Sequence, residues 1–299
     1  MKKYYCPAYR DAADAYVQAL DSIGCVRVTR YAEADFLLYD HEEHRGLVQA
    51  FADKPVFVYP HTPYSWFIWD GIVQPRRASA CFVYGESARQ GLQSFGYPNR
   101  IDVCGFPRGP VLPFCPTTGT KLLFAVAHPV ADHRFPQPEH YAQHRFVMDW
   151  VVANKRSFSE IRVRHAYDLR DNGFEAYANE PGIQFEQARM NVADGVASRE
   201  WADIVIAAGT FGYLSIAQGK PTLIYGYKGS RYCTRAGYVK HQQAYQHILE
   251  FPHYMEDMTA EQVLSFRDQP DPKVEAWKTG HLGGNFDAEK FIGVVREFI

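Results

Sequence analysis

Residues Trp201–Tyr225, with the sequence WADIVIAAGTFGYLSIAQGKPTLIY, carry the strongest pattern in the chain. An apolar run over Asp203–Ala207 predicts a buried strand, and the small-residue segment Tyr213–Gln218 predicts a helix. A second apolar run, Pro221–Tyr225, predicts the next strand. A strand–helix–strand unit of this length indicates two parallel strands joined by a right-handed crossover, which is the building block of α/β domains.

Between the first strand and the helix, Gly209-Thr210-Phe211-Gly212 predicts a turn. Glycines let the backbone approach a ligand closely, and the N–H groups at a helix start carry the positive end of the helix dipole. Ligands of open parallel sheets bind at the carboxyl ends of the strands, where this turn lies. The turn is therefore a candidate diphosphate site with Thr210 as a hydroxyl donor, although such glycine turns also occur in α/β proteins without a ligand.

The same alternation of strands and helices extends along the chain in both directions. Strands are predicted over residues 3–7, 26–30, 34–39, 54–59, 80–84, 101–104, 121–127, 160–164 and 183–186. Helices are predicted over residues 11–23, 45–51, 87–95, 141–154, 196–201, 259–266 and 287–298. Residues 105–119 are rich in Pro and Gly and lack periodicity, which predicts a linker.

This order predicts an α/β protein of two Rossmann-like domains, residues 1–113 and 119–299, whose parallel sheets face each other across a cleft. The last helix is placed so that it can pack back on the N-terminal domain.

Composition and cysteine use narrow the class of protein. The 299 residues carry a formal charge of −2, which disfavours long contacts with duplex DNA. None of the six cysteines has C-x-x-C spacing, and no H-E-x-x-H occurs, so we assign no metal site. The N-terminus lacks an apolar signal region, and no stretch reaches the roughly 20 apolar residues of a membrane span. The expected location is the cytoplasm.

Two segments resemble a known family. Ala202–Gly226 (ADIVIAAGTFGYLSIAQGKPTLIYG) resembles the donor-binding segment of GT-B glycosyltransferases and of their fold relatives, the UDP-N-acetylglucosamine 2-epimerases and CDP-glycerol glycerophosphotransferases. Phe82–Pro107 (FVYGESARQGLQSFGYPNRIDVCGFP) is similar to the end of their N-terminal domain. The resemblance implies a transferase whose C-terminal domain binds a nucleotide-activated sugar and whose N-terminal domain binds the acceptor.

The sequence also departs from that family. Many GT-B enzymes place a Glu after the glycine turn to hold the ribose, whereas this chain has Ser215–Gln218, so the nucleotide cannot be assumed to be UDP. No D-x-D motif occurs, which fits a metal-independent mechanism in which helix dipoles and cations stabilise the leaving diphosphate. We therefore expect no cofactor besides the donor, which is a substrate.

Three further residues are candidates for the donor phosphates. His128 precedes Pro129 after the first strand of the second domain and resembles the His-Pro motif of some sialyl- and Kdo-type transferases. Arg164 ends a predicted strand and can pair bidentately with phosphate. Lys228 lies in a basic loop after the strand that ends at Tyr225. For each of them, an ordinary loop or surface role is the alternative.

The first domain offers three candidate bases at strand ends, namely Asp40, His61 and Glu86. A base near the acceptor is required for an inverting transfer, and histidine has a pKa near neutral pH. A retaining outcome stays open.

The aromatic side chains of Tyr64, Trp66 and Trp69 follow His61 and predict an acceptor platform, because pyranose rings stack on aromatic faces. Packing of these rings into the core is the alternative. The acceptor class stays open between a glycan, a lipid-linked glycan and a modified nucleobase. Two other readings of the same fold remain: a nucleotide-sugar epimerase or hydrolase, and a non-catalytic nucleotide-sugar-binding protein.

Overall fold

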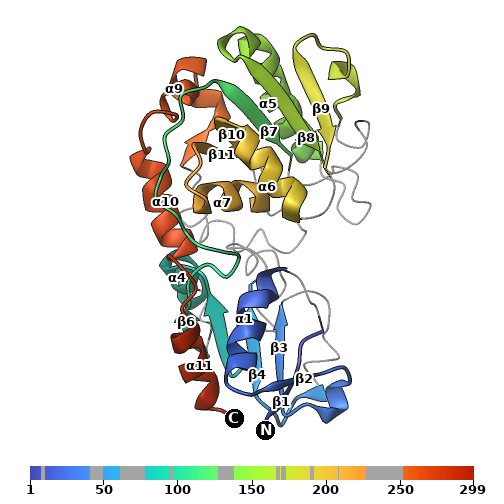
Figure 1. Cartoon of the computed structure of the whole chain (residues 1–299), viewed down its shortest axis with the longest axis vertical. Helices are drawn as coiled ribbons and strands as arrows, with labels where there is room; N and C mark the ends of the chain where they lie inside the picture. The colour runs from blue at the N-terminus through green and yellow to red at the C-terminus, as the bar shows by residue number, and fades with distance from the viewer. Residues whose placement is uncertain are drawn as a thin grey trace. The chain divides into compact units, whose positions relative to one another are not determined.

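The computed structural model describes twelve segments: residues 1–7, 11–40, 50–60, 78–94, 97, 99–126, 138–165, 169, 173–188, 192–207, 209–226 and 252–299. The chain divides into two compact units (Figure 1). Unit 1 includes Met1–Val111 and Lys278–Ile299, and unit 2 includes Leu112–Tyr232 and Glu250–Trp277. Each unit contains one six-stranded sheet, and all of the strand pairings are parallel.

The sheet of unit 1 has the strand order β2-β1-β3-β4-β5-β6. Its strands are β1 (Lys3–Tyr5), β2 (Val26–Val28), β3 (Phe36–Asp40), β4 (Val56–Tyr59), β5 (Ala80–Val83) and β6 (Arg100–Val103). Its helices are α1 (Asp11–Ser22), α4 (Glu86–Ser94) and α11 (Ala288–Arg296), with a 3-10 turn at Tyr31–Glu33. Alternate strand residues such as Phe36, Phe57 and Phe82 bury one face of the sheet against α1 and α11. The C-terminal helix is thus part of this core.

The sheet of unit 2 has the order β12-β11-β10-β7-β8-β9. Its strands are β7 (Lys121–Ala125), β8 (Glu160–His165), β9 (Ile183–Gln187), β10 (Ile204–Ala207), β11 (Thr222–Gly226) and β12 (His253–Tyr254). The α-helices are α5 (Pro138–Asn154), α6 (Val192–Trp201), α7 (Gly209–Ala217) and α9 (Ala260–Ser265), and α10 (Pro272–Leu282) runs from unit 2 into unit 1. Short 3-10 turns occur at Lys155–Ser157, Glu175–Tyr177 and Met255–Asp257.

Helices cover both faces of the second sheet, as a doubly wound fold requires. Alternate residues of β7 separate the two cores: Leu122 and Phe124 pack with α5, whereas Leu123 and Ala125 pack on the side of α6 and α7. Figure 1 shows α6 and α7 together on one face of this sheet. Among the described residues, no helix has the length and apolarity that a membrane crossing requires.

Strand order reverses once in each sheet. In unit 2 the chain proceeds from β7 to β8 and β9 and then places β10 on the other side of β7. In unit 1 it proceeds from β1 to β2 and then places β3 on the other side of β1. Crevices for ligands open at the carboxyl ends of the strands that flank such a reversal. These two points, β7/β10 and β1/β3, are where a binding site is expected.

The α/β class and the two parallel Rossmann-like sheets are confirmed. One local prediction is wrong: Gly209–Gly212 forms the first turn of helix α7 and is not a turn that precedes it. Helix α10 and strand β12 were not predicted, although Asp271 accepts hydrogen bonds from the N–H groups of Lys273 and Val274 and Pro272 is the first helical residue. Most of the predicted helix over residues 45–51 lies outside the described residues.

Candidate functional site

The strongest candidate site is the first turn of α7, which begins at Gly209, two residues after β10 ends. Ala207, the last residue of β10, pairs with Ala125, the last residue of β7, so this helix start lies directly at the β7/β10 reversal. The first N–H groups of an α-helix have no partner inside the helix, and they carry the positive end of its dipole. The sequence thus places backbone donors where the fold expects a ligand.

Small residues in α7 hold this helix close to the sheet. A Cβ built at Gly212 would lie 3.3 Å from both the Ala207 carbonyl oxygen and Ile224 Cγ1, a very tight contact. Ser215 is fully buried, and its hydroxyl donates to the Phe211 carbonyl oxygen at 2.8 Å. Close packing of this kind fixes the position of the first turn relative to the strand ends.

The other end of α7 is anchored by Gly219, whose φ is +73°. Its N–H bonds to the Ile216 carbonyl, and the Lys220 N–H bonds to the Ser215 carbonyl, which together form a Schellman C-cap. A Cβ at Gly219 would overlap the Pro113 carbonyl oxygen. The linker around Pro113 therefore packs against this glycine, and both ends of α7 have defined neighbours.

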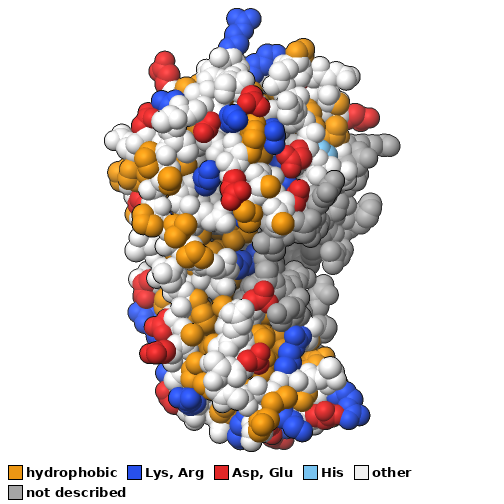
Figure 2. Space-filling model, viewed as in Figure 1, with side chains coloured by type: hydrophobic (Ala, Val, Ile, Leu, Met, Phe, Trp, Pro, Cys, Tyr) orange, Lys and Arg blue, Asp and Glu red, His pale blue; other side chains and the backbone are white. Residues whose placement is uncertain are grey.

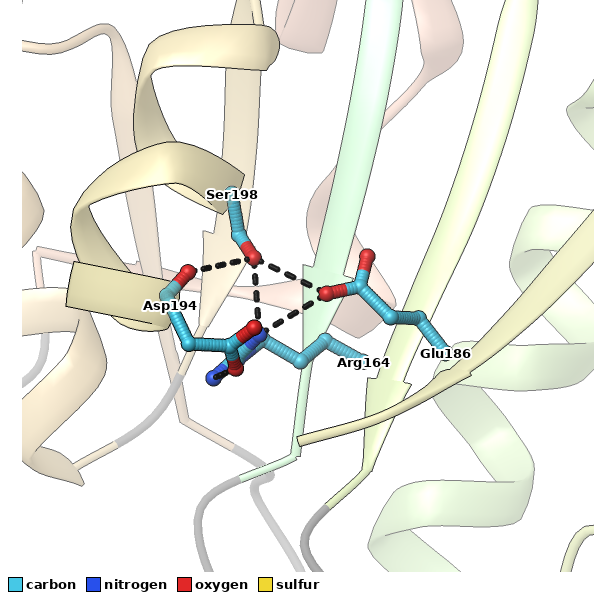
Figure 3. Close-up of polar contacts among 4 residues, drawn as sticks. All are labelled: Arg164, Glu186, Asp194 and Ser198. Atoms are coloured by element: carbon cyan, nitrogen blue, oxygen red, sulfur yellow. Dashed lines mark hydrogen bonds and ion pairs between the residues drawn. The ribbon is translucent and has the colours of Figure 1, made fainter. Parts of the chain in front are cut away.

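Arg164 lies near the end of β8 on the face that α6 and α7 cover, and only 6% of it is exposed. One amino nitrogen donates to Glu186 Oε1 at 2.9 Å and to Ser198 Oγ at 2.7 Å, and the other donates to Asp194 Oδ2 at 2.5 Å (Figure 3). Ser198 Oγ also lies 3.1 Å from Glu186 Oε1. The guanidinium thus joins the end of β9 to the first two turns of α6.

These contacts bear on the hypothesis that Arg164 holds phosphate. Buried charges are normally paired, and this one is paired with two carboxylates inside the protein. Its guanidinium carbon also lies 5.6 Å from the centre of the Phe211 ring in the first turn of α7. The arrangement favours a role in positioning α6 and α7 over direct phosphate binding.

A second buried guanidinium, that of Arg199 on α6, lies in the same region. Its Nε donates to Gln218 Oε1 at 2.7 Å, and its guanidinium carbon lies 5.1 Å from the Phe211 ring centre. Burial, together with the nearby charge of Arg164, lowers the pKa of Arg199 to about 10. Sequence reasoning missed Arg199, because nothing in its local sequence distinguishes it from a solvent-exposed helical arginine.

In unit 1, the β1/β3 reversal brings three polar side chains together. Cys6 follows β1, Asp40 ends β3, and Tyr59 ends β4 in register with Asp40. The Tyr59 hydroxyl donates to the Cys6 thiol, and the negative charge of Asp40 raises the pKa of both groups. Burial raises the pKa of Cys6 to about 11. Asp40 is 1% exposed, so the carboxylate predicted as a base lies beneath the surface at the expected strand end.

Glu86, the third candidate base, begins α4 and forms an exposed pair with Arg89, at 2.6 Å. The remaining predicted site residues lie outside the described residues: the base His61, the phosphate candidates His128 and Lys228, and the aromatic acceptor candidates Tyr64, Trp66 and Trp69. Thr210 and Phe211 are half-buried in the first turn of α7. The described segments hold no group of three His, Cys, Asp or Glu residues that is arranged to bind a metal.

The chain contains two doubly wound parallel sheets, the architecture of the GT-B fold. Solved structures match this chain over nearly its whole length. One similar structure is Staphylococcus aureus MnaA with UDP, at 11% identity and a TM-score of 0.61, with 100% of this chain and 97% of that chain covered. The UDP-GlcNAc 2-epimerase from Methanocaldococcus jannaschii is 10% identical with a TM-score of 0.58, covering 99% and 100%. The glycosyltransferase SnogD from Streptomyces nogalater is 12% identical with a TM-score of 0.53, covering 99% and 98%.

No protein-family model and no curated protein matches the sequence. At identities of 10 to 12%, the structural similarity establishes the fold.

Proposed function

We propose that this chain is an enzyme that acts on a nucleotide sugar, and specifically a glycosyltransferase that moves the sugar to an acceptor. The observation that carries this proposal is the start of α7 at Gly209, at the carboxyl end of β10 and beside the β7/β10 reversal. A helix start with small residues at that position is suited to bind a diphosphate.

In this proposal the first turn of α7 holds the diphosphate through the N–H groups of Gly209, Thr210 and Phe211, and the Thr210 hydroxyl adds a donor. Negative charge develops on the leaving diphosphate during the transfer, and fixed backbone dipoles stabilise it without reorganisation. Arg164 contributes indirectly, because it holds α6 beside Phe211. His128 and Lys228 remain proposed cationic contacts, and no metal is required.

Unit 1 supplies the acceptor site and the base in this proposal. Asp40 is supported by its place at the β1/β3 reversal, and His61 remains a proposed base on the sequence alone. The face shown in Figure 2 has Lys and Arg side chains interspersed with Asp and Glu among its described residues. Together with the formal charge of −2, this mixed face favours a glycan or lipid-linked glycan over a modified base in DNA.

An epimerase or hydrolase that acts on the same class of donor is the second candidate. The structural match to the M. jannaschii UDP-GlcNAc 2-epimerase is as complete as the match to the transferase SnogD. The two activities differ in their need for an acceptor. Turnover of the donor alone favours the epimerase or hydrolase, whereas turnover only after acceptor is added favours the transferase.

A thermal-shift screen against UDP-, GDP-, CMP-, CDP-, ADP- and dTDP-linked sugars tests the proposal. A donor at 100 times its Kd stabilises the folded protein by about 2.7 kcal/mol, which is readily measured. The donor that shifts the melting temperature is then incubated with and without a mixture of glycan acceptors, and nucleotide release is followed. Absence of a shift with every donor contradicts the nucleotide-sugar proposal.

A further inference from the structure

Arg199 and its neighbour Arg164 are both buried, but among the described residues only Arg164 is paired with carboxylates. Both residues are almost completely buried, with 3% of Arg199 and 6% of Arg164 exposed. Arg164 has two carboxylates as partners, Glu186 and Asp194. Within the described part of the chain, Arg199 forms no ion pair, and its one hydrogen bond goes to the neutral amide of Gln218. A buried cation without a counter-ion is costly in free energy, so an anionic partner is expected.

The direction of the Arg199 side chain indicates where that partner binds. Arg199 starts in the last turns of α6, yet its Nη1 atom lies so near the first turns of that helix that a Cβ on Gly195 would be 3.3 Å away. Its guanidinium carbon lies 5.1 Å from the ring centre of Phe211, the third residue of α7. The side chain therefore points back along α6 toward its first turns, and its guanidinium lies between the Phe211 ring in the first turn of α7 and the Gln218 amide just after the end of α7.

The first turns of a helix are a poor environment for a lone cation, because the positive end of the helix dipole repels it. Asp194 in the first turn of α6 offsets this effect for Arg164, to which it is bonded. No described carboxylate is bonded to Arg199 in the same way. Among the described residues, no hydrogen bond is made by the two amino groups of Arg199, so they can donate to a ligand near the Phe211 ring in the first turn of α7.

We propose that Arg199 binds the anion that occupies the first turn of α7, and that this anion is the diphosphate of the donor. The inference rests on the proposed function and adds a ligand residue that the sequence did not indicate. Gly195 is then required because a larger side chain would press against the guanidinium, and Phe211 is required because its ring supports the flat face of that group.

Pyrophosphate is the probe, and Arg162→Met is the matched control for Arg199→Met. Arg162 lies on the same face, where its guanidinium carbon packs 3.9 Å from the Trp201 ring centre, so the control removes an equal charge from a different place. Calorimetric titration at low salt is expected to show at least about tenfold weaker pyrophosphate binding in Arg199→Met. We expect a change of no more than about twofold in Arg162→Met, since only a screened long-range effect remains. Arg199→Lys is expected to bind pyrophosphate with intermediate affinity, because lysine keeps the positive charge but lacks the planar guanidinium that can form two parallel hydrogen bonds to phosphate.

Melting curves of the same variants separate binding from folding. Arg199→Met is expected to be as stable as the parent protein without ligand or more stable, and pyrophosphate is expected to raise the melting temperature of the parent much more than that of Arg199→Met. Equal weakening in Arg199→Met and Arg162→Met, unchanged binding in Arg199→Met, or no pyrophosphate binding by the parent protein would each overturn the inference. If the parent protein still binds UDP in those cases, the proposed function stands without this residue. If it binds neither pyrophosphate nor any nucleotide, both proposals fail.

Discussion

Replacing Arg164 by Met tests whether the network in Figure 3 holds α6 and α7 in place. The change removes the cation that pairs with Glu186 and Asp194 and leaves the two carboxylates without that charge. Breaking a buried ion pair costs about 3–5 kcal/mol. Because the side chains of Glu186 and Asp194 are 29% and 23% exposed, water solvates part of the remaining charge. We therefore expect the free energy of unfolding to fall by about 2–3 kcal/mol.

The assay is urea denaturation followed by tryptophan fluorescence, with Glu186→Gln as the control. That control keeps an acceptor for Arg164 and leaves Asp194 in place, so a loss of about 1 kcal/mol or less is expected. The melting temperature of Arg164→Met is expected to fall by about 5–10 °C, on the usual scaling for domains of this size. A loss below about 0.5 kcal/mol in Arg164→Met would show that the network contributes little, and its positioning role would have to be abandoned.

Three further predictions follow from single residues. Gly219→Ala should destabilise the protein by about 2 kcal/mol or more, because the new Cβ overlaps the Pro113 carbonyl oxygen. The control Gly182→Ala, at φ +84° with nothing within 4 Å of the new Cβ, should cost only about 1 kcal/mol. Equal losses of stability in denaturant titrations would refute the packing argument. Burial lowers the pKa of His281 from 6.5 to about 4, so the unfolded chain binds the proton more readily. Stability should fall by up to about 3 kcal/mol as the pH drops from about 6.5 to 4, and His281→Gln should flatten that slope. Thr210→Val should weaken donor binding about tenfold in titrations without a change in melting temperature, if its hydroxyl contacts the diphosphate.

The strands were predictable because burial dictates their composition. Runs such as FLLY before Asp40 and ACFVY before Gly85 lie in sheets buried on both faces, so they read as continuous apolar segments. The alternation with helices also predicted that the strands are parallel. The strand order and the two reversals, which show where a ligand is expected, were found only in the structure.

Features that depend on tertiary contacts could not be predicted. Glycine disfavours helices, so Gly209–Gly212 was expected to be a turn, whereas packing of Gly212 against Ala207 and Ile224 makes it helical. The partners of Arg164 are 22 and 30 residues away in the sequence, so neither could be inferred from local pattern. Likewise, only the folded structure shows that Arg199 forms no ion pair with the described residues.

Diphosphate binding by the first turn of α7 can be measured residue by residue. The experiment is a titration of isotopically labelled protein with UDP, followed by amide chemical shifts. We expect the largest shifts at the N–H groups of Gly209, Thr210 and Phe211, and the same three to respond to pyrophosphate alone. Saturable shifts confined to other residues, or no shifts at millimolar UDP and pyrophosphate, would contradict the claim.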